Sequence, residues 1–146
     1  MSWAVLACVL LIALTTVIHY EALRALQRAL PRLRIPSRSK LLVVMAVAFA
    51  AHLLEMAVYG LAMYSLIHWA GLGTLSGAPH TTLESCLYFS AETYTSLGFG
   101  DLTPQGPVRL LAGAEALNGL LLIGWTASFT YLAMERFWQD GDSAAL

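Results

Sequence analysis

The residues of this chain best suited to chemistry form a run with alternating glycines, Ser96-Leu97-Gly98-Phe99-Gly100-Asp101. Gly98 and Gly100 can adopt backbone conformations that residues with a Cβ resist, so successive carbonyls can turn toward one axis. Main-chain oxygens turned the same way can coordinate a cation, so the run is the first candidate site for chemistry.

Four further polar residues stand in otherwise apolar surroundings: His52, Glu55, Glu115 and Asn118. His52 and Glu55 are three positions apart and so share one helical face. An ionisable side chain inside a membrane is a functional candidate, because exposing it to lipid is costly. We interpret His52 and Glu55 as either an interhelical hydrogen-bond pair or a regulatory site that senses pH or contacts the first helix. Glu115 and Asn118 are expected to brace the glycine run or a neighbouring subunit, and the alternative for Glu115 is a regulatory role like that considered for His52 and Glu55.

The sequence contains no recognisable catalytic or metal-binding motif. His52 and Glu55 lack the second histidine of a zinc-protease motif, and Cys8 and Cys86 have no metal-ligand spacing. We read both cysteines as small packing residues. Without a nucleophile–base pair, we expect no enzyme activity, no cofactor other than a permeant ion, and no nucleic-acid partner.

Composition places these residues in a membrane. The chain has 146 residues, of which 58% are hydrophobic and 12% charged, and its mean hydropathy is +0.67. A soluble domain of this size carries about 25% charged residues. The length allows one domain.

Three apolar stretches, 3–20, 41–70 and 108–134, are long enough to cross about 30 Å of hydrocarbon. The first could instead be a secretory signal, but no basic residue precedes it and no clear cleavage site follows. We therefore expect an extra N-terminal transmembrane helix at 1–23. Residues 71–106 are too polar and too rich in Gly and Pro for another crossing. The predicted fold class is an all-α integral membrane protein with three transmembrane helices.

The basic residues predict an orientation. One Arg, Arg109, lies on the side of the 71–106 segment, whereas Arg136 follows the third span. Cytoplasmic loops are rich in Lys and Arg, so 24–40 is a basic cytoplasmic linker, the C-terminus is cytoplasmic and the N-terminus is outside the cell membrane. The linker either binds anionic lipid head groups or only sets topology. Its basic residues are Arg24, Arg28, Arg32, Arg34, Arg38 and Lys40.

A short helix should precede the glycine run. Thr81 is the expected N-cap, and Glu84 would return to its backbone N–H. A helix of about twelve residues within 81–94 reaches only about 18 Å, so it must stop near the middle of the bilayer and return. Its C-terminal end carries partial negative charge and would favour a cation there.

The run Ser96–Asp101, placed after this helix and between two spans, resembles the selectivity filter of potassium channels, usually worded Thr-Val-Gly-Tyr-Gly-Asp. The resemblance covers roughly residues 41–136. It implies a homotetramer, because ring closure by carbonyls needs four loops. It further implies a pore domain over 41–138, with an outer helix at 41–70, a re-entrant pore helix at 81–94, a filter at 95–101 and an inner helix at 107–137, before a short cytoplasmic tail at 139–146.

The resemblance also assigns roles to single residues. Potassium ions would bind the backbone carbonyls of the four residues from Ser96 to Phe99 and the Ser96 hydroxyl, with Thr95 at the start of the filter. Glu92 lies nine positions before Asp101, the spacing at which a bacterial potassium channel holds two carboxyls behind its filter. Glu92 and Asp101 would then form a protonation-sensitive brace that gates the filter; the alternative is a Glu92 carboxyl held by backbone amides alone. Gly124 falls at the inner-helix hinge, or is a packing glycine.

The sequence of this run differs from the commonest filter sequence at three positions. Ser96 and Leu97 are less restricted in rotamer than the usual residues, and Phe99 lacks the hydroxyl that tethers the filter to the pore helix. We expect a potassium-selective channel. The alternatives are a nonselective or sodium-permeable cation channel, and a non-conducting membrane subunit with the same fold.

Overall fold

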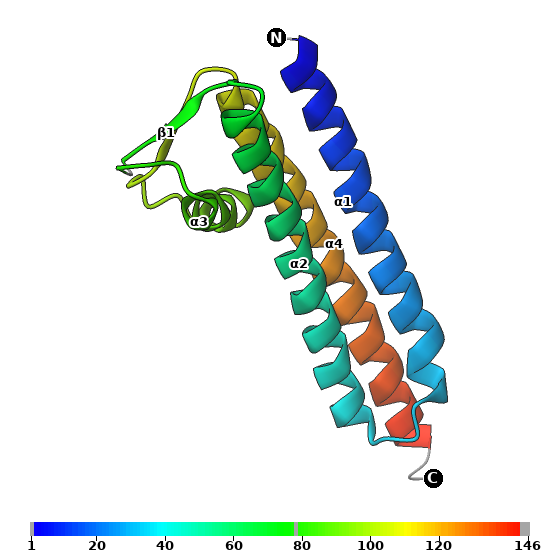
Figure 1. The fold of residues 1–146 in the computed structure, drawn as a ribbon. Helices are drawn as coiled ribbons and strands as arrows, with labels where there is room; N and C mark the ends of the chain where they lie inside the picture. The colour runs from blue at the N-terminus through cyan, green and yellow to red at the C-terminus, as the bar shows by residue number, and fades with distance from the viewer. Residues whose placement is uncertain (1, 78, 144–146) are drawn as a thin grey trace.

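Three long helices lie side by side, and a short helix packs against one end of two of them (Figure 1). The computed structural model describes residues 2–77 and 79–143. The long helices are α1 (Ser2–Ala29), α2 (Ser37–His68) and α4 (Val108–Ser143), and the short one is α3 (Leu83–Tyr94). In Figure 1 α3 is seen nearly end-on, so it is steeply inclined to the bundle. The start of α1 lies at the same end as α3, and the end of α4 lies at the opposite end.

Three membrane-length helices are confirmed within the described residues. The apolar spans run over Trp3–Arg32, Arg38–His68 and Val108–Arg136. Since each is long and apolar enough to cross a bilayer, the protein is a helical membrane protein. Within residues 2–77 and 79–143, the one exception to the all-α character is a small two-stranded sheet beside α3.

The basic linker is shorter than the sequence predicted. We expected a first helix ending at 23 and a linker over 24–40, but α1 continues to Ala29 and a 3-10 turn follows over Leu30–Arg32. The helix continues because no Gly or Pro occurs until Pro31, where the ring interrupts the hydrogen-bond ladder. Arg24 and Arg28 therefore extend from a helix, where long stems let their charges reach the membrane surface.

The other two long helices also differ from their expected bounds. α2 begins at Ser37 directly after Pro36, rather than at 41, and ends at His68 rather than 70. α4 begins at Val108 and continues to Ser143, so residues 139–143 of the predicted tail are helical and the inner helix does not end at 137. No helix-breaking residue stands between Pro107 and Ser143 except isolated glycines, which helices tolerate.

The N-cap of α3 is one residue later than predicted. Thr82, not Thr81, accepts a hydrogen bond from the Ser85 backbone N–H at 3.1 Å, and the Ser85 hydroxyl accepts one from the Thr82 N–H at 2.9 Å. The capping box thus uses Ser85, and Glu84 is exposed in the first turn. There its carboxylate still favours the positive helix end.

A two-stranded antiparallel sheet ties the chain before α3 to the chain after it. β1 (Thr74–Ser76) pairs with β2 (Thr103–Gln105), with Leu75 opposite Pro104. A Cβ on Gly77 would collide with the Asp101 carbonyl, so only glycine allows this close approach. The sheet therefore closes the α3 excursion into a loop with fixed ends.

Two apolar clusters form the core of the chain. The larger one joins α3 to the long helices and includes Tyr59, Met63, Cys86 and Leu111, each at most 1% exposed. The smaller lies toward the other end, around Val44. Both predicted packing cysteines, Cys8 and Cys86, are buried and unpaired.

Candidate functional site

The glycine run leaves the end of α3 in an alternating backbone conformation. Ser96, Gly98 and Gly100 have φ values of 57°, 55° and 82°, whereas Leu97 and Phe99 between them do not have positive φ. Such an alternation is the pattern that lets successive carbonyls face one side of a chain. The two glycines were expected to adopt it. Ser96 was not, and its left-handed conformation costs roughly 1–2 kcal/mol.

Three hydrogen bonds connect the run to the last turn of α3. The Ser96 N–H donates to the Thr93 carbonyl at 3.0 Å and the Leu97 N–H to the Glu92 carbonyl at 2.9 Å. The Phe99 N–H donates to the Glu92 carboxylate at 3.2 Å. Glu92 is 4% exposed, so it braces the run from inside the chain. This contact agrees with the alternative interpretation, in which backbone amides alone hold the Glu92 carboxyl.

Asp101 lies at the exposed end of the run, near the hydroxyl of Tyr88. Desolvation, together with hydrogen bonding and charge from Asp101 and Glu92, raises the pKa of Tyr88 to about 12. Tyr88 is thus the group that interacts with both carboxyls. Direct proton sharing between Glu92 and Asp101 stays a prediction.

The large side chains of the run are uncovered in a single chain. Leu97 is 60% and Phe99 is 69% exposed. No atom of the described chain lies within 4 Å of where a Cβ would stand on Gly98 or Gly100. The run therefore presents both its backbone and its apolar side chains to whatever adjoins the chain.

Glu115 and Asn118 of α4 are both buried, but they face different partners. Glu115 accepts a hydrogen bond from the Ser90 hydroxyl of α3, which is the expected contact with the back of the loop. Asn118 instead donates to Thr15 of α1 at 2.8 Å and to Tyr59 of α2 at 3.2 Å. Its amide thereby connects the three long helices.

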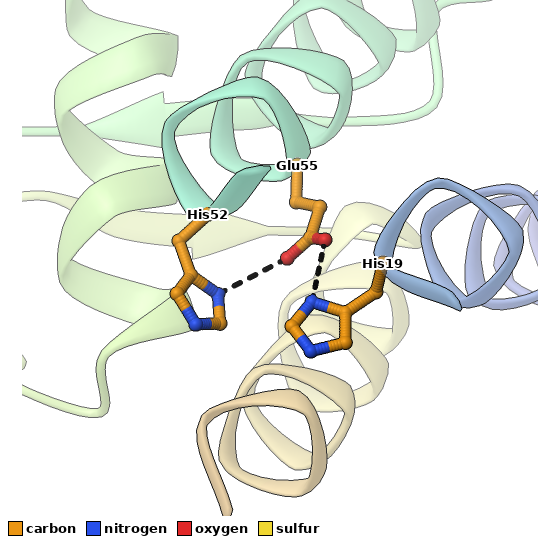
Figure 2. A group of neighbouring side chains, drawn as sticks. All are labelled: His19, His52 and Glu55. Atoms are coloured by element: carbon orange, nitrogen blue, oxygen red, sulfur yellow. Dashed lines mark hydrogen bonds and ion pairs between the residues drawn. The ribbon is translucent and has the colours of Figure 1, made fainter. Parts of the chain in front are cut away.

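His52 and Glu55 belong to a larger polar cluster at the point where all four helices meet (Figure 2). The Nδ1 atom of His19 on α1 lies 3.0 Å from Glu55 Oε1, and that of His52 lies 3.2 Å from Glu55 Oε2. Tyr94, the last residue of α3, donates to Glu55 Oε2, and Thr126 of α4 lies within hydrogen-bond distance of both imidazoles. The interhelical contact with the first helix is therefore present.

Sequence reasoning missed His19, Tyr94 and Thr126 as members of this cluster. His19 could have been found, because it is an ionisable residue inside an apolar span, the same signal that selected His52. Nothing in the sequence distinguishes Thr126 or Tyr94 from ordinary polar and aromatic residues in a membrane helix.

The glycines of α4 differ in what they contact. A Cβ on Gly119 would collide with the backbone carbonyl of Tyr94, so this glycine lets α4 approach the end of α3 closely. Gly124, the candidate hinge, has nothing within 4 Å of its Cβ position, and neither has Gly113. Packing within the described chain therefore does not explain why position 124 is a glycine. The role of Gly124 as a hinge stays a prediction.

These features define a helical membrane protein in which two long helices flank a short helix and a glycine-rich loop. A family model described as an ion channel matches residues 42–136. The chain therefore belongs to this ion-channel family, which confirms the resemblance to potassium-channel pore domains. The match covers α2, α3 and most of α4, and it leaves α1 outside.

Two curated relatives are similar over a shorter stretch. Protein LctB from Bacillus caldotenax and Protein LctB from Geobacillus stearothermophilus are each 50% identical to this chain over 40 residues. That stretch is 27% of this chain and 30% of each relative, so the similarity covers less than a third of their length. No solved structure matches the chain.

Proposed function

We propose that this ion-channel protein conducts potassium selectively through a filter formed by residues 95–101. The alternating left-handed backbone at Ser96, Gly98 and Gly100 is the observation that carries this proposal. Potassium ions would bind the carbonyls of Ser96, Leu97, Gly98 and Phe99, and the Ser96 hydroxyl would complete the innermost site. Carbonyls in such a ring replace the hydration shell of a permeant ion.

We propose that the chain enters the bilayer along α3 and returns to the same side. α3 has 12 residues and so reaches about 18 Å, too short to cross. β1 and β2 hold its two connections together, which supports a re-entrant loop. Irregular backbone at that depth is tolerated where protein or water surrounds it. The C-terminal end of α3, with its partial negative charge, would favour a cation at the filter entrance.

We infer that four copies surround the filter. One chain supplies one loop, and a ring of carbonyls needs several. The exposure of Leu97 and Phe99, 60% and 69%, supports this inference, because partner chains would cover apolar surface that this chain leaves open.

The charge pattern supports the orientation proposed for the cell membrane. The turn between α1 and α2 lies at the same end of the bundle as the end of α4 (Figure 1). Both carry Arg or Lys, including Arg32, Arg34 and Arg136. This end would face the cytoplasm, and the start of α1 and the filter mouth would lie outside.

A cavity of about 230 Å³ at the basic end supports anionic lipid as a partner. Its lining combines apolar residues with two cations, Lys40 and Arg136. A phosphate head group could contact the cations while its acyl chain follows the apolar wall. We propose that anionic lipids bind here, between the ends of α1 and α4 and the beginning of α2.

Ion flux and reversal potentials in reconstituted liposomes test the function. We expect potassium-driven flux and a reversal potential that follows the potassium gradient in mixed potassium and sodium. Gly98→Ala should abolish this selectivity, since φ of 55° disfavours a Cβ even though space is available. Gly113→Ala on α4, also without neighbours, is the matched control.

Two other outcomes would favour the rival functions. Equal permeability to sodium and potassium would favour a nonselective cation channel, an outcome that Phe99 supports because it cannot tether the filter through a hydroxyl. No flux from folded tetramers would favour a non-conducting membrane subunit.

A further inference from the structure

Two imidazoles and one carboxylate converge inside the four-helix junction (Figure 2). His19, His52 and Glu55 each offer one ligand atom, and these atoms all lie within 4.8 Å of one another. The side chains of His19 and Glu55 are fully buried, and that of His52 is 15% exposed. Buried ionisable groups are rare inside membrane spans, so three that face one point require a physical explanation.

Hydrogen bonds among the side chains alone leave the cluster one proton short. Five contacts form a closed ring: Glu55 to Tyr94, Tyr94 to His52 (2.9 Å), His52 to Thr126 (2.9 Å), Thr126 to His19 (3.2 Å) and His19 to Glu55 (3.0 Å). With Glu55 ionised and both imidazoles neutral, the two hydroxyls and two imidazoles supply one proton each. Four protons cannot serve all five contacts, so one more positive species, a further proton or a metal ion, would complete the ring.

We propose that His19, His52 and Glu55 bind a divalent transition metal of the Zn²⁺ class. Imidazole nitrogen and carboxylate oxygen are donors that Zn²⁺ prefers, and three protein ligands are a common set. The Nδ1 atoms of both histidines face the carboxylate, at 3.0 Å and 3.2 Å. The Tyr94 hydroxyl contacts two of the proposed ligand atoms, His52 Nδ1 and Glu55 Oε2.

The surroundings of the three ligands suit a metal. With the metal on Nδ1, each imidazole carries its proton on Nε2 and donates it to the same Thr126 oxygen, which has two lone pairs. The two distances to Thr126 are 2.9 Å and 3.2 Å. Metal-bound histidines usually make such a contact with their other nitrogen, and it fixes the orientation of the rings. A metal on the two Nδ1 atoms would replace their contacts with Glu55 and Tyr94 and keep the Nε2 contacts with Thr126.

This assignment gives α1 a role that does not depend on what the pore conducts. His19 lies on α1, outside the matched ion-channel region, whereas His52 and Glu55 lie on α2 inside it. A bound metal would fasten the extra helix to the pore domain, directly beside Tyr94 at the end of α3.

Cobalt substitution of the purified full chain tests the proposal. After chelator treatment, Co²⁺ should bind at one ion per chain with the intense visible absorption of a four-coordinate site, and Zn²⁺ should displace it. His19→Gln and Glu55→Gln should each weaken binding more than about tenfold. Thr126→Ala keeps all three ligands and should weaken binding less, which makes it the second variant should Glu55→Gln fail to fold.

His68→Gln is the matched control. His68 is exposed on α2 and contacts the Tyr64 carbonyl at 3.1 Å, far from the cluster in sequence, and its loss should leave Co²⁺ binding unchanged. Zn²⁺ should also raise the thermal unfolding midpoint of the wild type and not that of His19→Gln. A folded wild type without stoichiometric Co²⁺ would overturn the proposal and leave a proton as the positive species. Unchanged affinity in His19→Gln would overturn it as well.

Discussion

The Glu92 carboxylate is the single side chain in the described residues that hydrogen-bonds to the backbone of the proposed filter. It accepts the Phe99 N–H at 3.2 Å while the Glu92 side chain is almost completely buried. A typical hydrogen bond contributes about 0.5–1.5 kcal/mol, so this contact bears on how firmly the proposed filter is held. Because Phe99 lacks the tyrosine hydroxyl, the proposed filter depends more on this bond.

We expect Glu92→Ala to change the open lifetime of the filter more than Glu92→Gln. Alanine removes the acceptor, whereas the glutamine amide oxygen can still accept the Phe99 N–H but carries no charge. Single-channel recordings between pH 4 and 8 measure the effect.

Glu84→Gln supplies the control, since Glu84 is on the same helix but exposed. Identical gating of the wild type and both Glu92 variants at every pH would contradict the brace.

At the scale of the elements, the end of α3 is the point where the helices meet. Gly119 of α4 touches the Tyr94 carbonyl, and the Tyr94 hydroxyl reaches Glu55 of α2. On the other side of α3, Gly60 of α2 leaves room for Leu87, whose Cα would lie 3.0 Å from an added Cβ. Small residues thus set how closely the long helices approach the pore helix, as is common in membranes.

Gly119→Ala and Gly113→Ala should have opposite effects on stability. Alanine stabilises a helix interior by about 1 kcal/mol relative to glycine, so Gly113→Ala, with no neighbour, should be neutral or stabilising. Gly119→Ala must push the end of α3 away and should lower the thermal unfolding midpoint of the purified protein. A midpoint for Gly119→Ala equal to that of Gly113→Ala would show that α4 does not press on α3.

At the scale of the molecule, one chain leaves most of its membrane surface uncovered. Only 22–33% of the residues in the three apolar windows are buried within the chain. Lipid can cover much of this surface, but the proposed filter loop carries exposed Leu97 and Phe99. Backbone polar groups cannot face lipid without large cost, so we expect protein or water to adjoin the loop, as the proposed tetramer would provide.

We expect native mass spectrometry to detect four chains and Phe99→Ala to reduce the tetramer fraction. Phe99 is 69% exposed in one chain, and its truncation would remove apolar area between chains. Trp3→Ala is the control, because Trp3 is 73% exposed on α1, which lies across the bundle from α3 (Figure 1). A monomer or dimer as the largest species would contradict the tetrameric filter.

The sequence by itself determined the features that depend on local energies. Three apolar stretches predict three helices because the transfer free energy of each residue adds along the chain. Gly98 and Gly100 predict positive φ because the missing Cβ removes a local steric cost. The helix ends were less predictable: Thr82 rather than Thr81 caps α3, since the two threonines compete for one position.

Only the tertiary structure decided which polar residues meet. The long helices are apolar around most of their circumference, so sequence periodicity does not indicate which face turns inward. His19 and Glu55 are 36 positions apart, and Thr126 and His19 are 107 apart. These residues meet because of how α1 and α4 are rotated and packed against α2. Close packing of side chains, together with glycines such as Gly119 that allow close approach, determines this arrangement.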